Sequence, residues 1–159
     1  MNYRKIVPSF LIKNINHLRQ FFLWYKQGFL RNAPQLIKQN IFLKYGISNA
    51  QWVETGTFFG DTTDFLIKNF PKVYSIEPSK YLFNYVFKRF KSKKNVILFN
   101  NVSEKILPEL LPSLSGDINF WLDGHYSSGI TFKGDQDCPI RDELNHISNN
   151  LEKFNKILI

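Results

Sequence analysis

The stretch 51–64 combines a carboxylate and two glycines in an order that suits a nucleotide-like ligand. Glu54 follows two apolar residues, and Gly56 and Gly60 come after it, four positions apart. Asp61 and two threonines then supply the residue types that begin a helix. The order strand, tight turn and helix brings backbone close to a ligand at the carboxyl end of a strand. This stretch predicts one half of a binding site.

A second carboxylate, Glu77, predicts the other half of the site. It ends the apolar segment 72–77, twenty-one residues after Gly56. A carboxylate at this position of a parallel sheet can accept hydrogen bonds from both ribose hydroxyls of an adenosine. The alternative is an ordinary surface glutamate before a helix that starts at Pro78. We favour the ligand role because position and spacing agree.

The glycine spacing indicates which adenosine ligand to expect. A dinucleotide fingerprint requires G-x-G-x-x-G, whereas three residues separate Gly56 from Gly60. An acidic residue at the head of the turn is unfavourable beside a pyrophosphate but suits an ammonium group. S-adenosylmethionine carries an amine, a sulfonium, a carboxylate and a ribose diol. We therefore expect this cofactor. Glu54 would face its amine, the two glycines would let the backbone approach it closely, and Glu77 would hold its ribose diol.

Several segments resemble successive motifs of the class I S-adenosylmethionine-dependent methyltransferases. They are residues 53–60 (VETGTFFG), 74–78 (YSIEP) and 120–126 (FWLDGHY). Residues 123–131 (DGHYSSGIT) and 138–144 (CPIRDEL) resemble a bacterial branch of the family. The resemblance covers residues 50–159. It implies that the end of the third strand contacts adenine, and that the fourth strand ends at the active site.

The resemblance places these roles on particular residues of this chain. The adenine contacts fall on Asn101, Val102 and Ser103, and the active-site position falls on Asp123. If the methyl acceptor is a hydroxyl, its proton must leave, and His125 or Asp123 is a suitable base. In the alternative interpretation, Asp123 caps the loop and His125 is a structural loop residue.

A metal site on the same loop is a further alternative. Asp135, Asp137 and Cys138 lie close together in sequence, but no standard ligand spacing is present, so we predict no metal. Cys138 is the only cysteine, which excludes an intramolecular disulfide. No paired base marks it as a nucleophile.

Apolar runs that alternate with helical patterns predict an α/β, Rossmann-like, doubly wound and mostly parallel sheet. We expect strands over 51–55, 72–77, 95–100, 117–123 and 155–159. We expect helices over 61–70, 78–91, 103–111 and 139–154, preceded by helices over 9–31 and 34–45. The domains are a basic helical N-terminal extension, 1–49, and an S-adenosylmethionine-binding domain, 50–159.

The net charge of +8 belongs to the N-terminal third of the chain. Residues 1–50 contain eight Lys and Arg and no Asp or Glu, while the rest of the sequence balances thirteen basic against thirteen acidic residues. The helix over 9–31 mixes apolar and basic residues at helical spacing. We expect it to cover the sheet, with peripheral membrane contact as the alternative.

Composition and sequence length narrow the functional class. The sequence has 159 residues, 43% hydrophobic and 21% charged, which is typical of a globular protein. No apolar run reaches the roughly 18 to 20 residues that span a bilayer, and no signal peptide is evident, so we expect a cytoplasmic protein. The basic clusters at 88–91 and 93–94 lack a recognition signature, so we expect no nucleic-acid partner.

The family's sheet usually has seven strands, whereas this chain ends inside its fifth. We therefore expect either a fragment or a shortened chain whose sheet edge is covered by residues 1–50 or by a second subunit in a homodimer. The predicted function is methyl transfer from S-adenosylmethionine, to oxygen of a small molecule or sugar. The alternatives are a catalytically inactive cofactor-binding or scaffold domain, and a nicotinamide-dependent oxidoreductase, which the glycine spacing disfavours.

Overall fold

The computed structural model describes residues 9–30, 33–124 and 138–159, with residues 9–14 and 17 described by their backbone only. The chain forms two compact units, residues 1–44 and 45–159. The first contains α1 (Ser9–Lys26) and nearly all of α2 (Gln35–Tyr45). Among the described helices, none is long and apolar enough to cross a membrane.

The first helix is shorter than the 9–31 that the sequence predicts. It ends at Lys26 because Gly28 and Phe29 both adopt left-handed backbone conformations, with φ of 63° and 62°. Their amide groups donate to carbonyl oxygens in the last helical turn, which closes the helix end.

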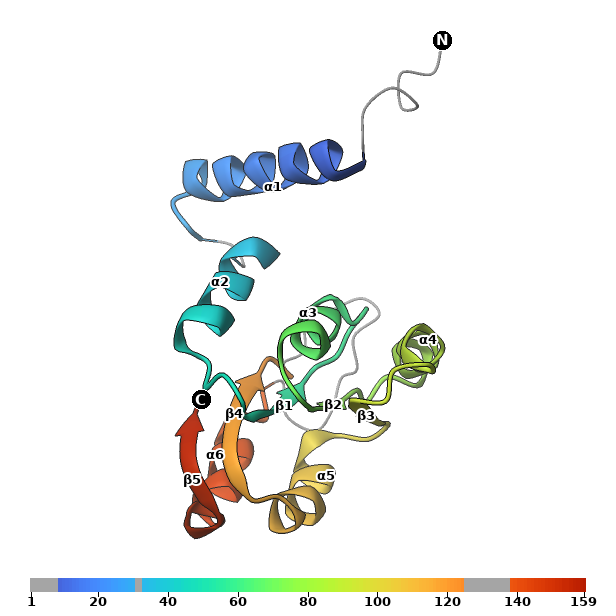
Figure 1. Cartoon of the computed structure of the whole chain (residues 1–159), viewed down its shortest axis with the longest axis vertical. Helices are drawn as coiled ribbons and strands as arrows, with labels where there is room; N and C mark the ends of the chain where they lie inside the picture. The colour runs from blue at the N-terminus through green and yellow to red at the C-terminus, as the bar shows by residue number, and fades with distance from the viewer. Residues whose placement is uncertain (1–8, 31–32, 125–137) are drawn as a thin grey trace. The chain divides into compact units, whose positions relative to one another are not determined.

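The second unit is built around a five-stranded sheet in the order β3-β2-β1-β4-β5, and all four strand pairs are parallel (Figure 1). The strands are β1 (Gln51–Thr55), β2 (Val73–Ile76), β3 (Val96–Phe99), β4 (Gly116–Leu122) and β5 (Phe154–Leu158). The helices are α3 (Asp61–Asn69), α4 (Lys80–Phe90), α5 (Ser103–Leu110) and α6 (Ile140–Ser148), with the short 3-10 helices η2 (Leu111–Ser113) and η3 (Leu151–Lys153). The predicted Rossmann-like α/β fold and its parallel sheet are confirmed.

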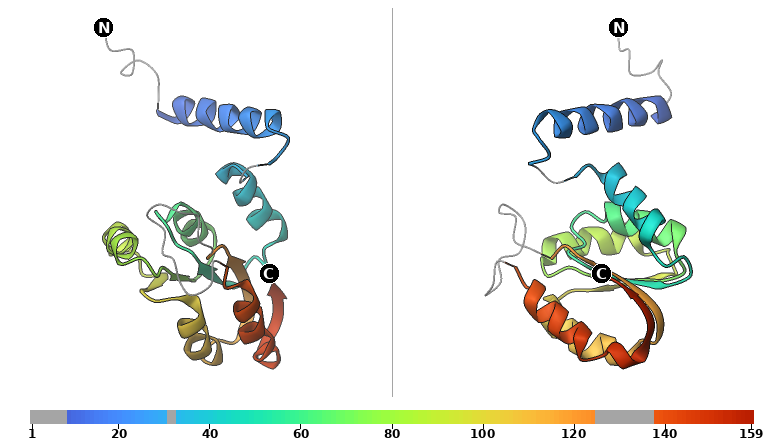
Figure 2. Two further views of the ribbon diagram at one scale, coloured as in Figure 1. Left: turned by 180° about the vertical axis from the view of Figure 1, so that it is seen from behind. Right: turned by 90° about the vertical axis from the view of Figure 1, so that its left-hand side faces the viewer.

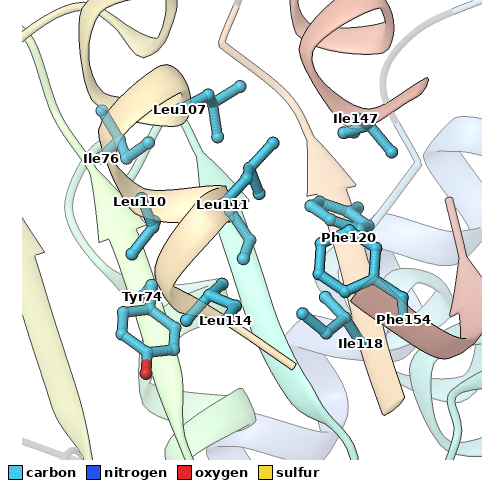
Figure 3. Packing of buried hydrophobic residues seen from close by; sticks show 11 residues of the cluster. Tyr74, Ile76, Leu107, Leu110, Leu111, Leu114, Ile118, Phe120, Ile147 and Phe154 are labelled. Atoms are coloured by element: carbon cyan, nitrogen blue, oxygen red, sulfur yellow. The ribbon is translucent and has the colours of Figure 1, made fainter. Parts of the chain in front are cut away.

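Helices cover both faces of this sheet: α3 and α4 lie on one face, and α5 and α6 lie on the other (Figure 2). On the α5 and α6 face, Ile118 and Phe120 of β4 pack with Leu107, Leu111 and Ile147 in one apolar cluster (Figure 3). A parallel sheet buried on both faces explains why the strands appear in the sequence as apolar runs rather than as alternating residues.

The predicted helix over 139–154 is wrong in its second half. The helix ends at Ser148, and the side chain of Asn150 donates to the His146 carbonyl at 2.9 Å. An asparagine that bonds to backbone in this way competes with helix continuation. The chain then enters β5 at Phe154, whose buried ring packs edge-on against Phe120 at 6.2 Å between centroids.

A buried asparagine fixes the entry to the sheet. The Oδ1 atom of Asn119, in β4, accepts from the backbone nitrogen of Ile47 at 2.9 Å, and its Nδ2 donates to the Ile47 carbonyl at 3.0 Å. Both polar ends of the fully buried side chain are therefore satisfied. This pairing holds the segment before β1 against the neighbouring strand.

Candidate functional site

The predicted site residues come together because β1, β2 and β4 end at the same level. Thr55, the last residue of β1, is in register with the last residues of β2 and β4. The next residue on each strand is Gly56, Glu77 or Asp123. These three therefore meet at the carboxyl edge of the sheet, where parallel α/β proteins bind ligands.

The turn after β1 requires glycine at its first position. Gly56 has φ of 81°, and its backbone nitrogen donates to the Ile76 carbonyl at 3.0 Å. A Cβ atom placed on Gly56 would lie 2.6 Å from the carbonyl oxygen of Asp123. The missing side chain thus lets the turn lie directly against the end of β4.

The second glycine of the turn serves helix packing. Gly60 precedes α3 with φ of 80°, and a Cβ there would lie 2.6 Å from Cε2 of Phe90 in α4. Between the two glycines, Phe58 is also left-handed, with φ of 52°. The predicted approach of Gly60 to a ligand stays a prediction.

Glu77 is almost completely buried and holds this turn. Its Oε2 accepts from the backbone nitrogen of Phe58 at 2.8 Å, and its Oε1 accepts from that of Ser79 at 2.9 Å. Burial raises the pKa of Glu77, and the two backbone hydrogen bonds partly offset this. Each carboxylate oxygen can accept a second hydrogen bond, so capacity for the ribose hydroxyls remains.

Glu54 is buried on the α3 face of the sheet among hydroxyl groups. Its Oε2 accepts from Oγ1 of Thr63, in α3, and from Oγ of Ser75, in β2, each at 2.6 Å. The Ser75 hydroxyl also lies 2.6 Å from that of Thr57. Glu54 therefore joins α3 to two strands, and its predicted contact with the cofactor amine stays a prediction.

The residues predicted to contact adenine follow β3. Asn101 is exposed, and its Oδ1 accepts from the backbone nitrogen of Val102 at 2.9 Å. Ser103 is buried, and its hydroxyl donates to Oε2 of Glu104 at 3.2 Å. Of the three predicted residues, only Asn101 presents an exposed side chain.

The predicted chemistry falls partly outside the described residues. Asp123 is half-buried, and its backbone nitrogen donates to the Thr55 carbonyl at 3.2 Å. His125 and the alternative metal ligands Asp135 and Asp137 lie outside the described residues, whereas Cys138 is exposed with a free thiol. The part of the chain that the structure describes contains no group of three His, Cys, Asp or Glu that could hold a metal ion.

Glu143 is a buried carboxylate that the sequence interpretation did not assign to the site. It reaches from α6 toward Thr55, and each residue is only 1% exposed. A Cβ on Gly124 would lie 3.1 Å from Thr55 Oγ1 and 3.4 Å from Glu143 Oε1, so both side chains lie beneath the end of β4. Within the described residues, neither of these two oxygens has a hydrogen-bond partner.

The environment of Glu143 disfavours its charged form. Burial is the largest effect and raises its pKa, while the nearby hydroxyls of Ser103 and Thr55 lower it and the negative charge of Glu104 raises it further. These hydroxyls therefore face the carboxyl, although Thr55 does not complete a hydrogen bond to it.

A signal for Glu143 is present in the sequence but is hard to interpret. The apolar residues Ile140, Leu144 and Ile147 predict the buried stripe of α6. In the structure, Ile140 and Leu144 are partly exposed, and Glu143 is buried one turn before Ile147. A carboxylate four residues before a core isoleucine is the pattern that could have marked it.

No protein-family model matches the chain, and no curated protein matches it. Solved structures do. A Streptococcus mutans protein described as a methyltransferase, in complex with SAH, is similar with a TM-score of 0.53 and 16% identity over 79% of this chain and 69% of its own. An rRNA methylase from Streptococcus thermophilus is similar with a TM-score of 0.50 and 14% identity, over 79% of this chain and 68% of its own. The 23S rRNA methyltransferase ErmE is similar with a TM-score of 0.53 and 11% identity, over 77% of this chain and 43% of its own.

The chain shares the Rossmann-like α/β fold of these three methyltransferase structures. At these identities the likeness concerns the fold, so the methyltransferase chemistry must be argued from the residues. Two features of those residues fit the cofactor. Glu77 is a carboxylate with acceptor capacity at the edge where the Gly56 turn packs against the end of β4, and Thr55 and Glu143 carry unpaired buried oxygens.

Proposed function

We propose that the chain binds S-adenosylmethionine at the carboxyl edge of β1, β2 and β4 and transfers its methyl group to oxygen of a small molecule or sugar. The observation that carries this proposal is the meeting of Gly56 and Glu77 at one edge. Gly56 lets the turn lie directly against the end of β4, and the Glu77 carboxylate is held in place by two backbone donors. When bound, S-adenosylmethionine supplies an electrophilic methyl carbon on a sulfonium.

The residues of the chain have separate tasks in this proposal. Glu77 accepts from the ribose hydroxyls, the turn at Gly56 lies beside the amino-acid portion, and the exposed Asn101 is available at the adenine. Asp123 or His125 removes the proton from the acceptor hydroxyl. The position of Asp123 at the end of β4, in register with the turn, supports this role.

Isothermal titration calorimetry with S-adenosylmethionine tests cofactor binding. The parent protein is expected to bind, and Glu77→Ala is expected to bind at least about tenfold more weakly because both ribose hydrogen bonds are lost. Glu109→Ala is the matched control, since it removes an exposed glutamate from α5. Thermal unfolding of each variant shows whether the fold is kept. Failure of the parent to bind, or equal binding by Glu77→Ala, contradicts the proposal.

The acceptor class is tested by following SAH formation. We expect turnover with a panel of hydroxylated small molecules and sugars, and none with total RNA. Turnover only with RNA would refute the small-molecule acceptor but would support methyltransferase activity. RNA is included because two structural neighbours are named for rRNA. Binding without turnover on either panel would favour an inactive binding domain.

For α1 we propose peripheral contact with an anionic membrane. Leu18 and Phe22, one helical turn apart, are 70% and 56% exposed, and the first unit contains no acidic residue. Sedimentation with phosphatidylglycerol vesicles should be lost in Leu18→Glu and Phe22→Glu. Gln20→Glu introduces the same charge at an exposed polar position of this helix and should retain more binding. Equal binding by all three variants contradicts the proposal.

A further inference from the structure

Two buried carboxylates lie near the end of β1, on opposite faces of the sheet. Glu54 lies on the α3 face, where the hydroxyls of Thr63 and Ser75 each donate to its Oε2 at 2.6 Å. Glu143 approaches the other face, which carries the side chain of Thr55 because consecutive strand residues point to opposite faces. The first carboxylate is bound within the fold, whereas the second retains an unpaired oxygen.

The unpaired atoms on the Glu143 side converge. Gly124 allows its backbone to lie against both of them, since the position of a Cβ there is 3.1 Å from Thr55 Oγ1 and 3.4 Å from Glu143 Oε1. Leaving a buried carboxylate oxygen and a hydroxyl unpaired is costly, and native structures normally satisfy such groups. The Thr55 hydroxyl can donate as well as accept, whereas the carboxylate oxygen of Glu143 can only accept, so a further donor placed between them would satisfy both.

The charges around Glu143 indicate the kind of donor. From α5, Glu104 adds a second negative charge and Ser103 adds only a neutral hydroxyl, while Thr55 of β1 is neutral as well. In the described parts of the chain, the ion pairs of Lys68 and Arg89 are made to other carboxylates, and none is made to Glu143. A ligand that carries a positively charged donor would meet this need.

We propose that Glu143 and Thr55 bind the ammonium group of the amino-acid portion of S-adenosylmethionine. An ammonium has three donors, so it can satisfy Glu143 Oε1 and Thr55 Oγ1 together. The position agrees with the candidate site, because Thr55 directly precedes Gly56 and Gly124 directly follows Asp123. The inference rests on the proposed function, and it assigns to Glu143 the amine contact that the sequence predicts for Glu54.

Three ligands separate the ammonium contact from the rest of the cofactor. S-adenosylmethionine carries the ammonium and the carboxylate, its decarboxylated form keeps the amine, and 5′-methylthioadenosine has neither. Calorimetric titration of Glu143→Gln, which keeps side-chain size, should show roughly 10- to 100-fold weaker binding of the two amines. Its affinity for 5′-methylthioadenosine should equal that of the parent. Glu109→Gln is the matched surface control.

Each outcome decides a separate point. The role of Glu143 is overturned if Glu143→Gln loses affinity equally for all three ligands, or if it keeps the parent's affinity for the two amine ligands. If Glu54→Gln selectively weakens binding of the two amine ligands and Glu143→Gln does not, the amine contact belongs to Glu54 and the role of Glu143 is overturned. If Glu77→Ala weakens all three ligands, the proposed function stands whatever Glu143 does. If the parent binds none of them, both proposals fail.

A measurement on the parent alone covers the case in which Glu143→Gln does not fold. Burial and Glu104 raise the pKa of Glu143, and only its charged form attracts an ammonium. S-adenosylmethionine affinity should therefore rise from pH 5 to pH 7, where the ligand amine stays charged. Affinity for 5′-methylthioadenosine reports the titration of Glu77, so the ratio of the two affinities reports the carboxylates beside the amino-acid portion, which include Glu143. A ratio that does not change with pH overturns the inference.

Discussion

The backbone nitrogen of Phe58 donates a hydrogen bond of 2.8 Å to Oε2 of Glu77. Phe58 adopts a left-handed conformation in the turn after β1, and its nitrogen bonds across to the residue that follows β2. The residue that we expect to hold the ribose therefore also holds the turn. This second role places the carboxylate in a buried position, where its charged form is disfavoured.

Raised carboxyl pKa values give a first prediction about stability and pH. Glu77 and Glu143 have pKa values above the ordinary 4.5 in the folded state, so the folded protein binds more protons than the unfolded chain. The stability they contribute is complete below pH 4.5 and is lost as the pH rises through the folded values. Urea unfolding between pH 4.5 and 8 should show a smaller loss for Glu143→Gln than for the parent.

Glu109→Gln controls for the removal of a carboxylate from an exposed position. Its stability should change with pH as that of the parent does. An identical pH dependence in the parent and in Glu143→Gln would show that the Glu143 carboxyl titrates alike in the folded and unfolded chain, contrary to its burial.

Gly56→Ala should be much more destabilising than Gly116→Ala. Both glycines have positive φ, 81° and 85°, so both alanines carry the conformational cost of about 1–2 kcal/mol. Only at Gly56 does the new Cβ meet backbone, at 2.6 Å from the Asp123 oxygen, whereas Gly116 has open space. We expect a further loss of about 1–3 kcal/mol at Gly56 from overpacking. Urea unfolding measures both, and equal losses would contradict the close approach.

The pairing of Asn119 with Ile47 predicts a large effect of Asn119→Ala. It leaves both the amide and the carbonyl of Ile47 without their partner, at about 1–3 kcal/mol for each group that stays buried. Asn69→Ala is the matched control, because Asn69 is exposed and bonds only to the Phe65 carbonyl. Chemical denaturation should separate the two by more than about 1 kcal/mol. Similar losses would mean that water replaces the Asn119 contacts.

Thr63→Val should destabilise the domain by about 1–3 kcal/mol because it removes a hydroxyl donor to the buried Glu54. A double-mutant cycle with Glu54→Gln tests the pairing directly. The two losses should be clearly non-additive if the hydroxyl acts through this carboxylate. Additive losses would show that Thr63 contributes by packing alone.

The sequence predicted the elements of the second unit and the residues at their carboxyl ends. Apolar runs and glycine turns are local signals, and in a parallel sheet they suffice to bring Gly56, Glu77 and Asp123 to one edge. The end of α6 was missed because Leu151 continued an apolar pattern, while the competing signal, the asparagine pair 149–150, is weaker.

Side-chain partners could not be predicted in the same way. Glu54 and Glu143 are both acidic residues within candidate motifs, and the local sequence does not show which of them keeps an unpaired oxygen. Their difference arises from which face of the sheet each approaches and which hydroxyls lie there. Gly60 shows the same limit, because its neighbour, Phe90, lies thirty residues away in the sequence.

That contact between Gly60 and Phe90 has a consequence for the evolution of the fold. The ring of Phe90 occupies the space that any side chain at position 60 would need, at 2.6 Å from a Cβ. The two positions should therefore covary. In related sequences that keep this turn, a residue larger than glycine at position 60 should occur together with a smaller residue at position 90, such as leucine or valine.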